Sequence, residues 1–229
     1  AVHFLPQSRP RFFMIGVRGD LTIPSDHIAD GPCALWHPPA LIEGCNLLST
    51  SASARWLWWN IPTPPARNTN LASLIEDRPT GVKWHTKAET NYLLDMMTEH
   101  NRSKVEAAKE CGERIVGTIY RRTRADADGV KRQRAEVRFD QIAGCLRTPA
   151  GGSSRQTIMV VDGDNVRSRL LSTREAALLM GLPETYALPE RYNDAYKLAG
   201  DGVAVPVVRH LAASIFEPIL RRNRLAIAA

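Results

Sequence analysis

Short apolar runs alternate with long polar and proline-rich stretches along this chain, a pattern that predicts a mixture of strands and helices. The first run, residues 12–17, is apolar and holds a glycine near its end, which is typical of a buried strand. Few residues precede it, and a domain rarely opens on a buried strand. We therefore expect the chain to be the C-terminal portion of a longer protein, or a subunit that joins a partner.

Residues 18–80 are predicted to be irregular. They are rich in proline, which blocks long helices and central strands, so extended connections are expected. Within this stretch, residues 56–62 hold three tryptophans and other apolar side chains. Such a cluster packs a loop against a surface or stacks on nucleic-acid bases. Packing is favoured, because Arg55 is the one basic residue beside the cluster.

Capping-box patterns mark the starts of two helices. Residues 86–89 open the first, apolar residues follow at helical spacing, and Gly112 ends the helix or its continuation. Residues 172–175 open a short second helix that Gly181 stops. A final helix is expected from Pro206, with an apolar stripe that must pack on a large surface.

Residues 114–138 carry an excess of arginine around a turn at residues 126–129. The flanking residues 115–120 and 135–139 alternate like strands, so a basic β-ribbon with an exposed tip is predicted. Charge runs are usually solvated faces, and that interpretation stays open. The planar arginine side chain, however, suits phosphates and guanine edges. The candidate DNA-binding residues here are Arg121, Arg122 and Arg124.

A loop rich in glycine and hydroxyl side chains follows, before a strand at residues 157–161 and a hairpin turn at residues 162–165. Its backbone can approach a ligand closely, and it offers N–H, O–H and guanidinium donors to a phosphate. A plain flexible turn is the alternative. The candidate DNA-binding residues of this loop are Arg147, Thr148, Gly151, Gly152, Ser153, Ser154 and Arg155.

The composition narrows the class of protein. The 229 residues are 44% hydrophobic and 24% charged, which is too balanced for a wholly disordered chain. We find no run of about 18 apolar residues, so no membrane span is expected, and no charged leader that would predict a signal peptide. The formal net charge of +6 permits a polyanionic partner. The cysteines lie far apart, which predicts no metal site and no disulfide and fits a reducing cytosol.

Three segments, in order, resemble the C-terminal part of a DNA cytosine-5 methyltransferase. Residues 6–11, Pro-Gln-Ser-Arg-Pro-Arg, resemble the eighth motif of that family, Gln-x-Arg-x-Arg. Residues 171–183 resemble the ninth, an Arg-Glu-Ala helix that ends in Gly-x-Pro. Residues 196–206 resemble the tenth, Tyr-Lys followed after two residues by Gly-Asn-x-Val. The long gap between the first two segments is where the family inserts its variable target-recognition domain.

The resemblance implies an α/β fold, the C-terminal part of a Rossmann-like S-adenosylmethionine-dependent methyltransferase with an inserted irregular α+β target-recognition domain. Residues 1–25 would end the catalytic domain with the Gln-x-Arg-x-Arg strand, and residues 26–165 would form the target-recognition region. Residues 166–229 would return to the catalytic domain as C-terminal helices. A cytoplasmic protein of bacterial or phage-like origin is implied as well.

The resemblance also implies a chemistry. In this family the target cytosine is flipped out of the DNA helix into a pocket. A cysteine thiolate adds to its C6, a glutamic acid stabilises the protonated N3, and C5 receives the methyl group of S-adenosylmethionine. The implied pocket residues in this sequence are Gln7, Arg9 and Arg11. Arg11 would reach O2 of the base or a neighbouring phosphate, and Arg9 would support the nucleophile loop.

Further roles follow from the other two motifs. The methionine end of S-adenosylmethionine would lie against Gly200, Asp201, Gly202 and Val203. Asp201 stands where the family has asparagine, so it keeps an acceptor but loses two hydrogen-bond donors. Two residues would be structural: Glu175 would cap its helix, and Arg174 would brace the recognition domain.

The earlier motifs of the family are absent from the 229 residues, which hold no Phe-x-Gly-x-Gly, no Pro-Cys-Gln and no Glu-Asn-Val. Cys33 follows a proline but lacks the glutamine, and it lies after the eighth motif instead of before it. We therefore expect activity on double-stranded DNA only together with an N-terminal catalytic half, from the same longer chain or a separate subunit. The alternative is a non-catalytic DNA-binding module or a degenerate methyltransferase fragment.

Overall fold

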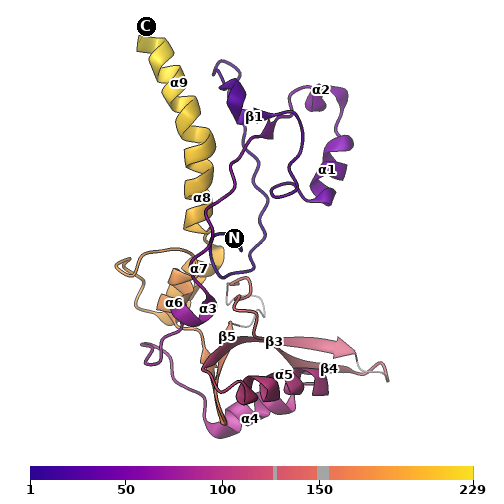
Figure 1. The fold of residues 1–229 in the computed structure, drawn as a ribbon, viewed down its shortest axis with the longest axis vertical. Coiled ribbons are helices and arrows are strands. Elements are labelled where there is room, and N and C mark those ends of the chain that lie inside the picture. The colour runs from indigo at the N-terminus through magenta and orange to yellow at the C-terminus, as the bar shows by residue number, and fades with distance from the viewer. Residues whose placement is uncertain (126–127, 149–154, 229) are drawn as a thin grey trace. The chain divides into compact units, whose positions relative to one another are not determined.

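The computed structural model of the chain describes residues 1–125, 128–148 and 155–228, and Figure 1 shows their course. The chain forms two compact units, each built from two stretches of sequence. The first unit holds Ala1–Arg11 and Ala66–Val205, and the second holds Phe12–Pro65 and Pro206–Ala229. These units divide the chain differently from the functional boundaries after residues 25 and 165, which stay predictions.

A four-stranded antiparallel sheet is the centre of the first unit. Its strands are β3 (Ile115–Ala125), β4 (Lys131–Arg138), β5 (Thr157–Asp162) and β6 (Asn165–Leu170), in the spatial order β4-β3-β5-β6. The predicted ribbon is β3 with β4, and the predicted hairpin turn joins β5 to β6, so both predictions are confirmed. The mixture of helix and sheet fits the expected class. The Rossmann-like sheet and the inserted domain stay predictions.

Two helices cover one face of this sheet, α4 (Lys87–Asp95) and α5 (Glu99–Glu110) (Figure 1). The predicted capping box is confirmed, because Thr86 and Glu89 exchange hydrogen bonds at the start of α4. The helix then breaks at residues 96–98, where the N–H of Ala135 donates to the carbonyl of Met96 at 3.1 Å. That contact joins the turn to the edge of β4, and α5 continues to the turn at Gly112.

The other face of the sheet packs against α3 (Leu71–Leu74), α6 (Thr173–Leu178) and α7 (Tyr192–Asp201). Val116 and Ile158 of the sheet share a fully buried core with Leu71, Leu179 and Tyr196. The capping box and the stop predicted for α6 are confirmed. The sequence pattern did not predict α7, since glycine near its end lowers helix propensity.

The second unit consists of short elements packed on the C-terminal helix. Its elements are η1 (Ser25–His27), β1 (Ile28–Ala29), α1 (Pro39–Asn46), α2 (Thr50–Ser53), β2 (Trp58–Trp59), the π-helical turn η2 (Ala212–Phe216) and α9 (Glu217–Ala228), with α8 (Val205–Leu211) leading into η2. Ile215 and Ile219 pack with Trp59 and Ile61. The packing role of the tryptophan cluster is confirmed. The irregular course predicted for residues 18–80 is confirmed in part, because short helices form there that were not predicted.

The buried strand predicted at residues 12–17 was wrong. Among the described residues this segment pairs with no strand, and its Phe12 and Met14 side chains are 64% and 77% exposed. Ile15 and Val17 instead pack against the C-terminal helix. A short apolar run has the same appearance whether it joins a sheet or lies along a helix, so the sequence could not distinguish the two.

One helical run, Tyr192–Arg224, is long and apolar enough to cross a membrane by length and composition, although no such span was expected. One such run is weak evidence for a membrane span. Here α7 ends at Asp201 and α8 begins at Val205, so the run is not one uninterrupted helix. Ala195 and Tyr196 of α7 are buried in the first unit.

Candidate functional site

Gln7 fastens the N-terminal segment to the core of the first unit. Its side chain is fully buried, and its amide nitrogen donates to the carbonyl oxygen of Leu179 at 2.7 Å and to the sulfur of Met180 at 3.5 Å. Its main chain forms a parallel bridge to Ala143. The side-chain oxygen of Gln7 has no hydrogen-bond partner among the described residues. Gln7 therefore holds the segment in place rather than facing solvent.

Arg9 is a buried cation bonded to main-chain carbonyls. Its guanidinium donates to the carbonyl oxygens of Leu146 at 2.9 Å, Gly200 at 2.8 Å and Gly202 at 2.6 Å, and the residue is only 3% exposed. Burial lowers the pKa of Arg9 from its usual value, and the nearby Cys145 thiol opposes that shift. Because a guanidinium stays protonated in proteins, these are charge-assisted bonds that tie three segments together.

Gln7 and Arg9 bring together the three motif segments that lie far apart in the sequence. Gln7 contacts the end of residues 171–183, and Arg9 contacts residues 200 and 202 within the third segment. All three segments belong to the first unit. The amide nitrogen of Gln7 and the two terminal nitrogens of Arg9 make these internal contacts.

Arg11 differs from the other two predicted pocket residues because its side chain is exposed. One nitrogen of its guanidinium donates to the carbonyl of Pro10 at 2.8 Å, and another lies 3.7 Å from the sulfur of Cys145. The same sulfur lies 3.6 Å from Arg9. Arg11 is therefore the predicted pocket residue whose charge can meet a ligand arriving from solvent.

Gly200, one of the predicted cofactor residues, packs against the start of the predicted DNA-binding loop. A Cβ added at Gly200 would lie 2.8 Å from main-chain atoms of both Arg147 and Thr148, so only glycine lets α7 approach that loop so closely. The side chains of Asp201 and Val203, just beyond, are exposed. The loop residues Gly151, Gly152, Ser153 and Ser154 lie outside the described residues.

Two tyrosines of α7 hold the far end of the same loop. The N–H of Gln156 donates to the hydroxyl of Tyr196 at 2.9 Å, and burial raises the pKa of Tyr196 to about 12. Tyr192 stacks on Tyr196, and the guanidinium carbon of Arg155 lies 5.5 Å from the centre of the Tyr192 ring. Arg155 also donates to Asn193. The tyrosine of the third motif therefore has a structural role that the sequence did not reveal.

Glu175 caps its helix as predicted and forms a buried ion pair that was not predicted. Its carboxylate accepts hydrogen bonds from Arg169 at 2.6 and 2.8 Å and from the N–H groups of Ser172 and Glu76, and both ionic side chains are fully buried. Arg174 donates instead to the carbonyl of Tyr186, beyond its own helix. Glu175 and Arg169 therefore make the hydrogen bonds to the main chain of Glu76, which lies within residues 26–165. Arg174 makes no hydrogen bond to that region among the described residues, so the bracing role predicted for it has no support from these contacts.

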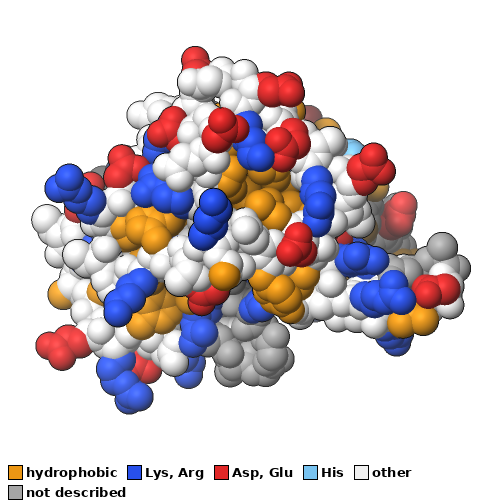
Figure 2. Space-filling view, turned by 90° about the horizontal axis from the view of Figure 1, so that it is seen from below, with side chains coloured by type: hydrophobic (Ala, Val, Ile, Leu, Met, Phe, Trp, Pro, Cys, Tyr) orange, Lys and Arg blue, Asp and Glu red, His pale blue; other side chains and the backbone are white. Residues whose placement is uncertain are grey.

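The arginine-rich ribbon projects from the sheet, and Figure 2 shows Lys and Arg side chains gathered on its free end, at the right of the view. Its register pairs Arg122 with Arg134 and Arg124 with Arg132, whereas Arg121 pairs with Ala135. Side chains alternate between the faces of a strand. The three predicted DNA-binding arginines of the ribbon are therefore divided between its two faces, with Arg121 opposite to the other two.

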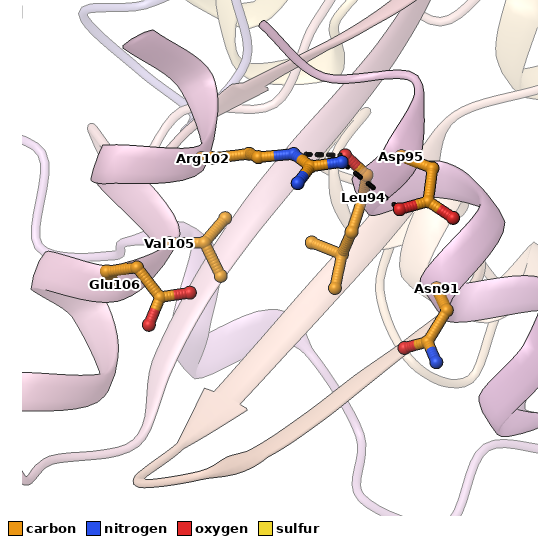
Figure 3. Close-up of a pocket in the computed structure, with 6 residues that line it drawn as sticks. All are labelled: Asn91, Leu94, Asp95, Arg102, Val105 and Glu106. Atoms are coloured by element: carbon orange, nitrogen blue, oxygen red, sulfur yellow. Dashed lines mark hydrogen bonds and ion pairs between the residues drawn. The ribbon is translucent and has the colours of Figure 1, made fainter. Parts of the chain in front are cut away.

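A separate cavity of about 230 Å³ lies between α4 and α5 (Figure 3). Arg102 spans it, donating to the carbonyl of Leu94 and to the carboxylate of Asp95, both at 3.1 Å. The cavity is lined by Asn91, Leu94, Asp95, Arg102, Val105 and Glu106. None of the predicted site residues is among them, and the pairing of Arg102 with Asp95 fits a structural contact between the helices.

Two comparisons with known proteins bear on this site. A family model described as C-5 cytosine-specific DNA methylase matches residues 4–217. One similar curated protein is the Type II methyltransferase M1.ScrFI of Lactococcus lactis subsp. cremoris, 36% identical over 66 residues. That alignment covers 29% of this chain and 17% of the relative, so the chain matches less than a fifth of the length of the relative.

Proposed function

Because the chain belongs to the C-5 cytosine-specific DNA methylase family, we propose that it is the C-terminal portion, or a separate subunit, of a site-specific DNA cytosine-5 methyltransferase. The reaction is transfer of a methyl group from S-adenosylmethionine to C5 of a flipped cytosine. The nucleophilic cysteine comes from an N-terminal catalytic half. The observation that carries this proposal is the family match over residues 4–217, supported by the convergence of the three motif segments through Gln7 and Arg9.

In this proposal Arg11 contacts the substrate, and Gln7 and Arg9 are positioning residues. The two buried side chains bind main-chain carbonyls and so fix the segment that presents Arg11. The exposed guanidinium of Arg11 donates to O2 of the flipped base or to the phosphate beside it. A charge-assisted hydrogen bond of this kind is roughly twice as strong as a neutral one.

The residues at the end of α7 fit the methionine end of S-adenosylmethionine, which supplies the methyl group when it is bound. That end of the molecule carries an ammonium group, and the exposed carboxylate of Asp201 is an acceptor for it. Gly200 lies against the main chain of Arg147 and Thr148, so it fixes the end of α7, and with it Asp201, against the loop. Val203 is 45% exposed and offers an apolar surface just beyond Asp201.

Double-stranded DNA is the proposed partner of the first unit. Arg147 is exposed beside Gly200, and Arg155 lies over Tyr192, so the two described ends of the loop both carry guanidinium groups. Such groups bind phosphate oxygens and fix the register of a protein on the duplex. The ribbon adds further arginines next to this loop in the sequence.

The alternative is a non-catalytic DNA-binding module or degenerate fragment, and the observation that favours it is the lack of a Pro-Cys-Gln sequence in the 229 residues. The test is transfer of a tritiated methyl group from S-adenosylmethionine to mixed-sequence duplex DNA. We expect no transfer by this chain alone and steady transfer when it is combined with an N-terminal half that carries Pro-Cys-Gln.

The controls separate the two candidates. Turnover by the isolated chain that disappears in Cys33→Ser would overturn the proposal and make Cys33 the nucleophile. DNA binding without any transfer by the combined halves, under conditions where the halves form a complex, would favour the non-catalytic module. Replacing the cysteine of Pro-Cys-Gln by alanine in the N-terminal half should abolish transfer if the proposal is correct.

A further inference from the structure

The two faces of the ribbon carry different side chains, and one of them concentrates positive charge. Arg122 lies directly opposite Arg134, and Arg124 lies directly opposite Arg132. We call these four residues the arginine face. Like charges directly opposite on neighbouring strands are destabilising. A double row of arginines is therefore not explained by the stability of the ribbon alone.

Three arginines of this face are exposed, and the ribbon sequence holds more cations than carboxylates. Arg122, Arg124 and Arg132 have side chains 53%, 51% and 55% exposed. Glu136 accepts a hydrogen bond from Arg124 at 2.8 Å and lies 3.6 Å from Arg122, and Asp128 lies 3.5 Å from Arg132. In the sequence, residues 120–138 hold six arginines and one lysine against three Asp or Glu residues, so the ribbon carries a net positive charge that attracts an anion.

The same face leads toward the candidate site. Tyr120 occupies the next position inward, and the guanidinium carbon of Arg122 lies 5.5 Å from the centre of its ring. The hydroxyl end of Tyr120 rests on Gly144, where an added Cβ would lie 2.5 Å from the tyrosine oxygen. Gly144 precedes Cys145, whose sulfur lies 3.7 Å from Arg11. These contacts connect the arginine face to Arg11 through neighbouring residues of the first unit.

The length of this path suits one strand of nucleic acid. Residues on one face of a strand recur about every 6.8 Å, so Tyr120 to Arg124 spans about 14 Å. Successive phosphates of one DNA strand are separated by the rise along the helix axis and by the rotation about it, so this span is long enough to contact more than one neighbouring phosphate of that strand. The opposite face, with Arg121, Thr123, Gln133 and Lys131, has no such arginine rows.

We propose that the arginine face binds the phosphate backbone of the DNA strand and directs it over Tyr120 toward Arg11. This inference rests on the proposed function, because it takes DNA as the partner, and it adds Arg132, Arg134 and Tyr120 to the binding surface. It also assigns Arg121, one position away from Arg122, to the side that does not bind DNA.

The test compares two double variants of the full chain that lose the same charge from opposite faces. Binding to a short mixed-sequence DNA duplex is measured by fluorescence anisotropy over a series of salt concentrations. Arg122→Gln with Arg134→Gln should reduce the slope of log affinity against log salt by about 2, since each phosphate contact contributes roughly 0.9. Arg121→Gln with Lys131→Gln should leave the slope unchanged. Arg122→Lys with Arg134→Lys keeps the charge and should keep the slope.

Each outcome decides a separate question. Equal flattening of the slope by the two Gln variants, or an unchanged slope in both, would overturn the arginine face while leaving DNA as the partner. If the unmodified chain binds DNA without salt dependence or does not bind it, the DNA-binding part of the proposed function fails first. Thermal unfolding of each variant verifies that it is folded, so that a change in slope reports a lost contact with DNA.

Discussion

Arg9 donates a hydrogen bond of 2.8 Å to the carbonyl oxygen of Gly200, although 191 positions separate the two residues in the sequence. The same guanidinium binds the carbonyls of Leu146 and Gly202. A single buried cation thus links the N-terminal segment, the start of the arginine- and glycine-rich loop and the end of α7. The geometry of the candidate site depends on this cation more than on any local sequence feature.

Arg9→Ala should destabilise the chain by about 3–5 kcal/mol, because two buried carbonyls and one partly buried carbonyl would lose charged donors at once. Arg11→Ala is the matched control: its side chain is exposed, and we expect a change within about 0.5 kcal/mol. The measurement is the free energy of unfolding in urea. A loss below about 1 kcal/mol for Arg9→Ala would mean that the three hydrogen bonds contribute little.

Gly200→Ala should destabilise the chain and displace the loop, because the new methyl group would lie 2.8 Å from main-chain atoms of Arg147 and Thr148. Overpacking of this kind typically costs about 1–3 kcal/mol. Gly44→Ala in α1 is a helical control with nothing within 4 Å of the added carbon. That variant should be neutral or gain up to about 1 kcal/mol from helix propensity. Thermal unfolding of both proteins tests the expected difference in sign.

Local signals predicted the structure wherever a few neighbouring residues decide the conformation. Capping boxes at residues 86–89 and 172–175 located α4 and α6, and the turn at residues 162–165 located the β5–β6 hairpin. The alternating pattern of the ribbon was equally reliable in placing β3 and β4. The same alternation also places Arg121 on one face of the ribbon and Arg122 and Arg124 on the other, as the observed register shows.

Long-range contacts could not be predicted in the same way. Nothing adjacent to Arg169 indicates that it is fully buried, because its partner Glu175 and the main chain of Glu76 meet it only in the folded chain. Gln7 and Arg9 donate hydrogen bonds to carbonyl oxygens of residues more than a hundred positions away in the sequence. The strand prediction for residues 12–17 was wrong for a related reason, because the tertiary structure decides whether an apolar segment packs on a sheet or on a helix.

Tyr196 should make the stability of the chain fall at high pH. Burial raises its pKa to about 12 in the folded chain, above the ordinary value of 10. Between these values the unfolded chain loses the proton while the folded chain keeps it, so stability present below pH 10 is lost as the pH rises toward 12. The loss is about 1.4 kcal/mol per pH unit in this window.

Tyr196→Phe removes this titration and gives the matched measurement. The variant should be less stable at pH 8 by about 1–3 kcal/mol, because the N–H of Gln156 loses its acceptor. Above pH 10 its unfolding free energy should fall less steeply than that of the unmodified chain. Burial also raises the pKa of Tyr192, so part of the decline will remain. Parallel curves for the two proteins would contradict the prediction.

Glu136→Gln should strengthen DNA binding. The hydrogen bond from Arg124 lowers the pKa of Glu136, so its carboxylate is charged at neutral pH and opposes a phosphate on the arginine face. An exposed ion pair contributes up to about 1 kcal/mol, which corresponds to a gain of about two- to five-fold in affinity. Glu106→Gln on α5 removes a carboxylate outside that face and should have little effect. Fluorescence anisotropy at one fixed salt concentration measures both, and weaker binding by Glu136→Gln would show that the carboxylate organises the site.

Arg11→Ala should impair methyl transfer far more than DNA binding, once the chain is combined with its N-terminal half. In the proposed function Arg11 contacts O2 of the flipped base or the phosphate beside it, and this prediction takes the contact to form only after flipping, so that the hydrogen bond acts at the reacting centre and not in the initial complex. One such charge-assisted contact is worth roughly 1.5–3 kcal/mol, or a loss of about ten- to a hundred-fold in turnover. Arg11→Lys keeps the charge and should recover part of the rate. Single-turnover methyl transfer and anisotropy are measured on the same preparations. Equal losses in rate and affinity would instead identify Arg11 as a contact to a phosphate that is held before the base flips, because such a contact contributes to both quantities alike.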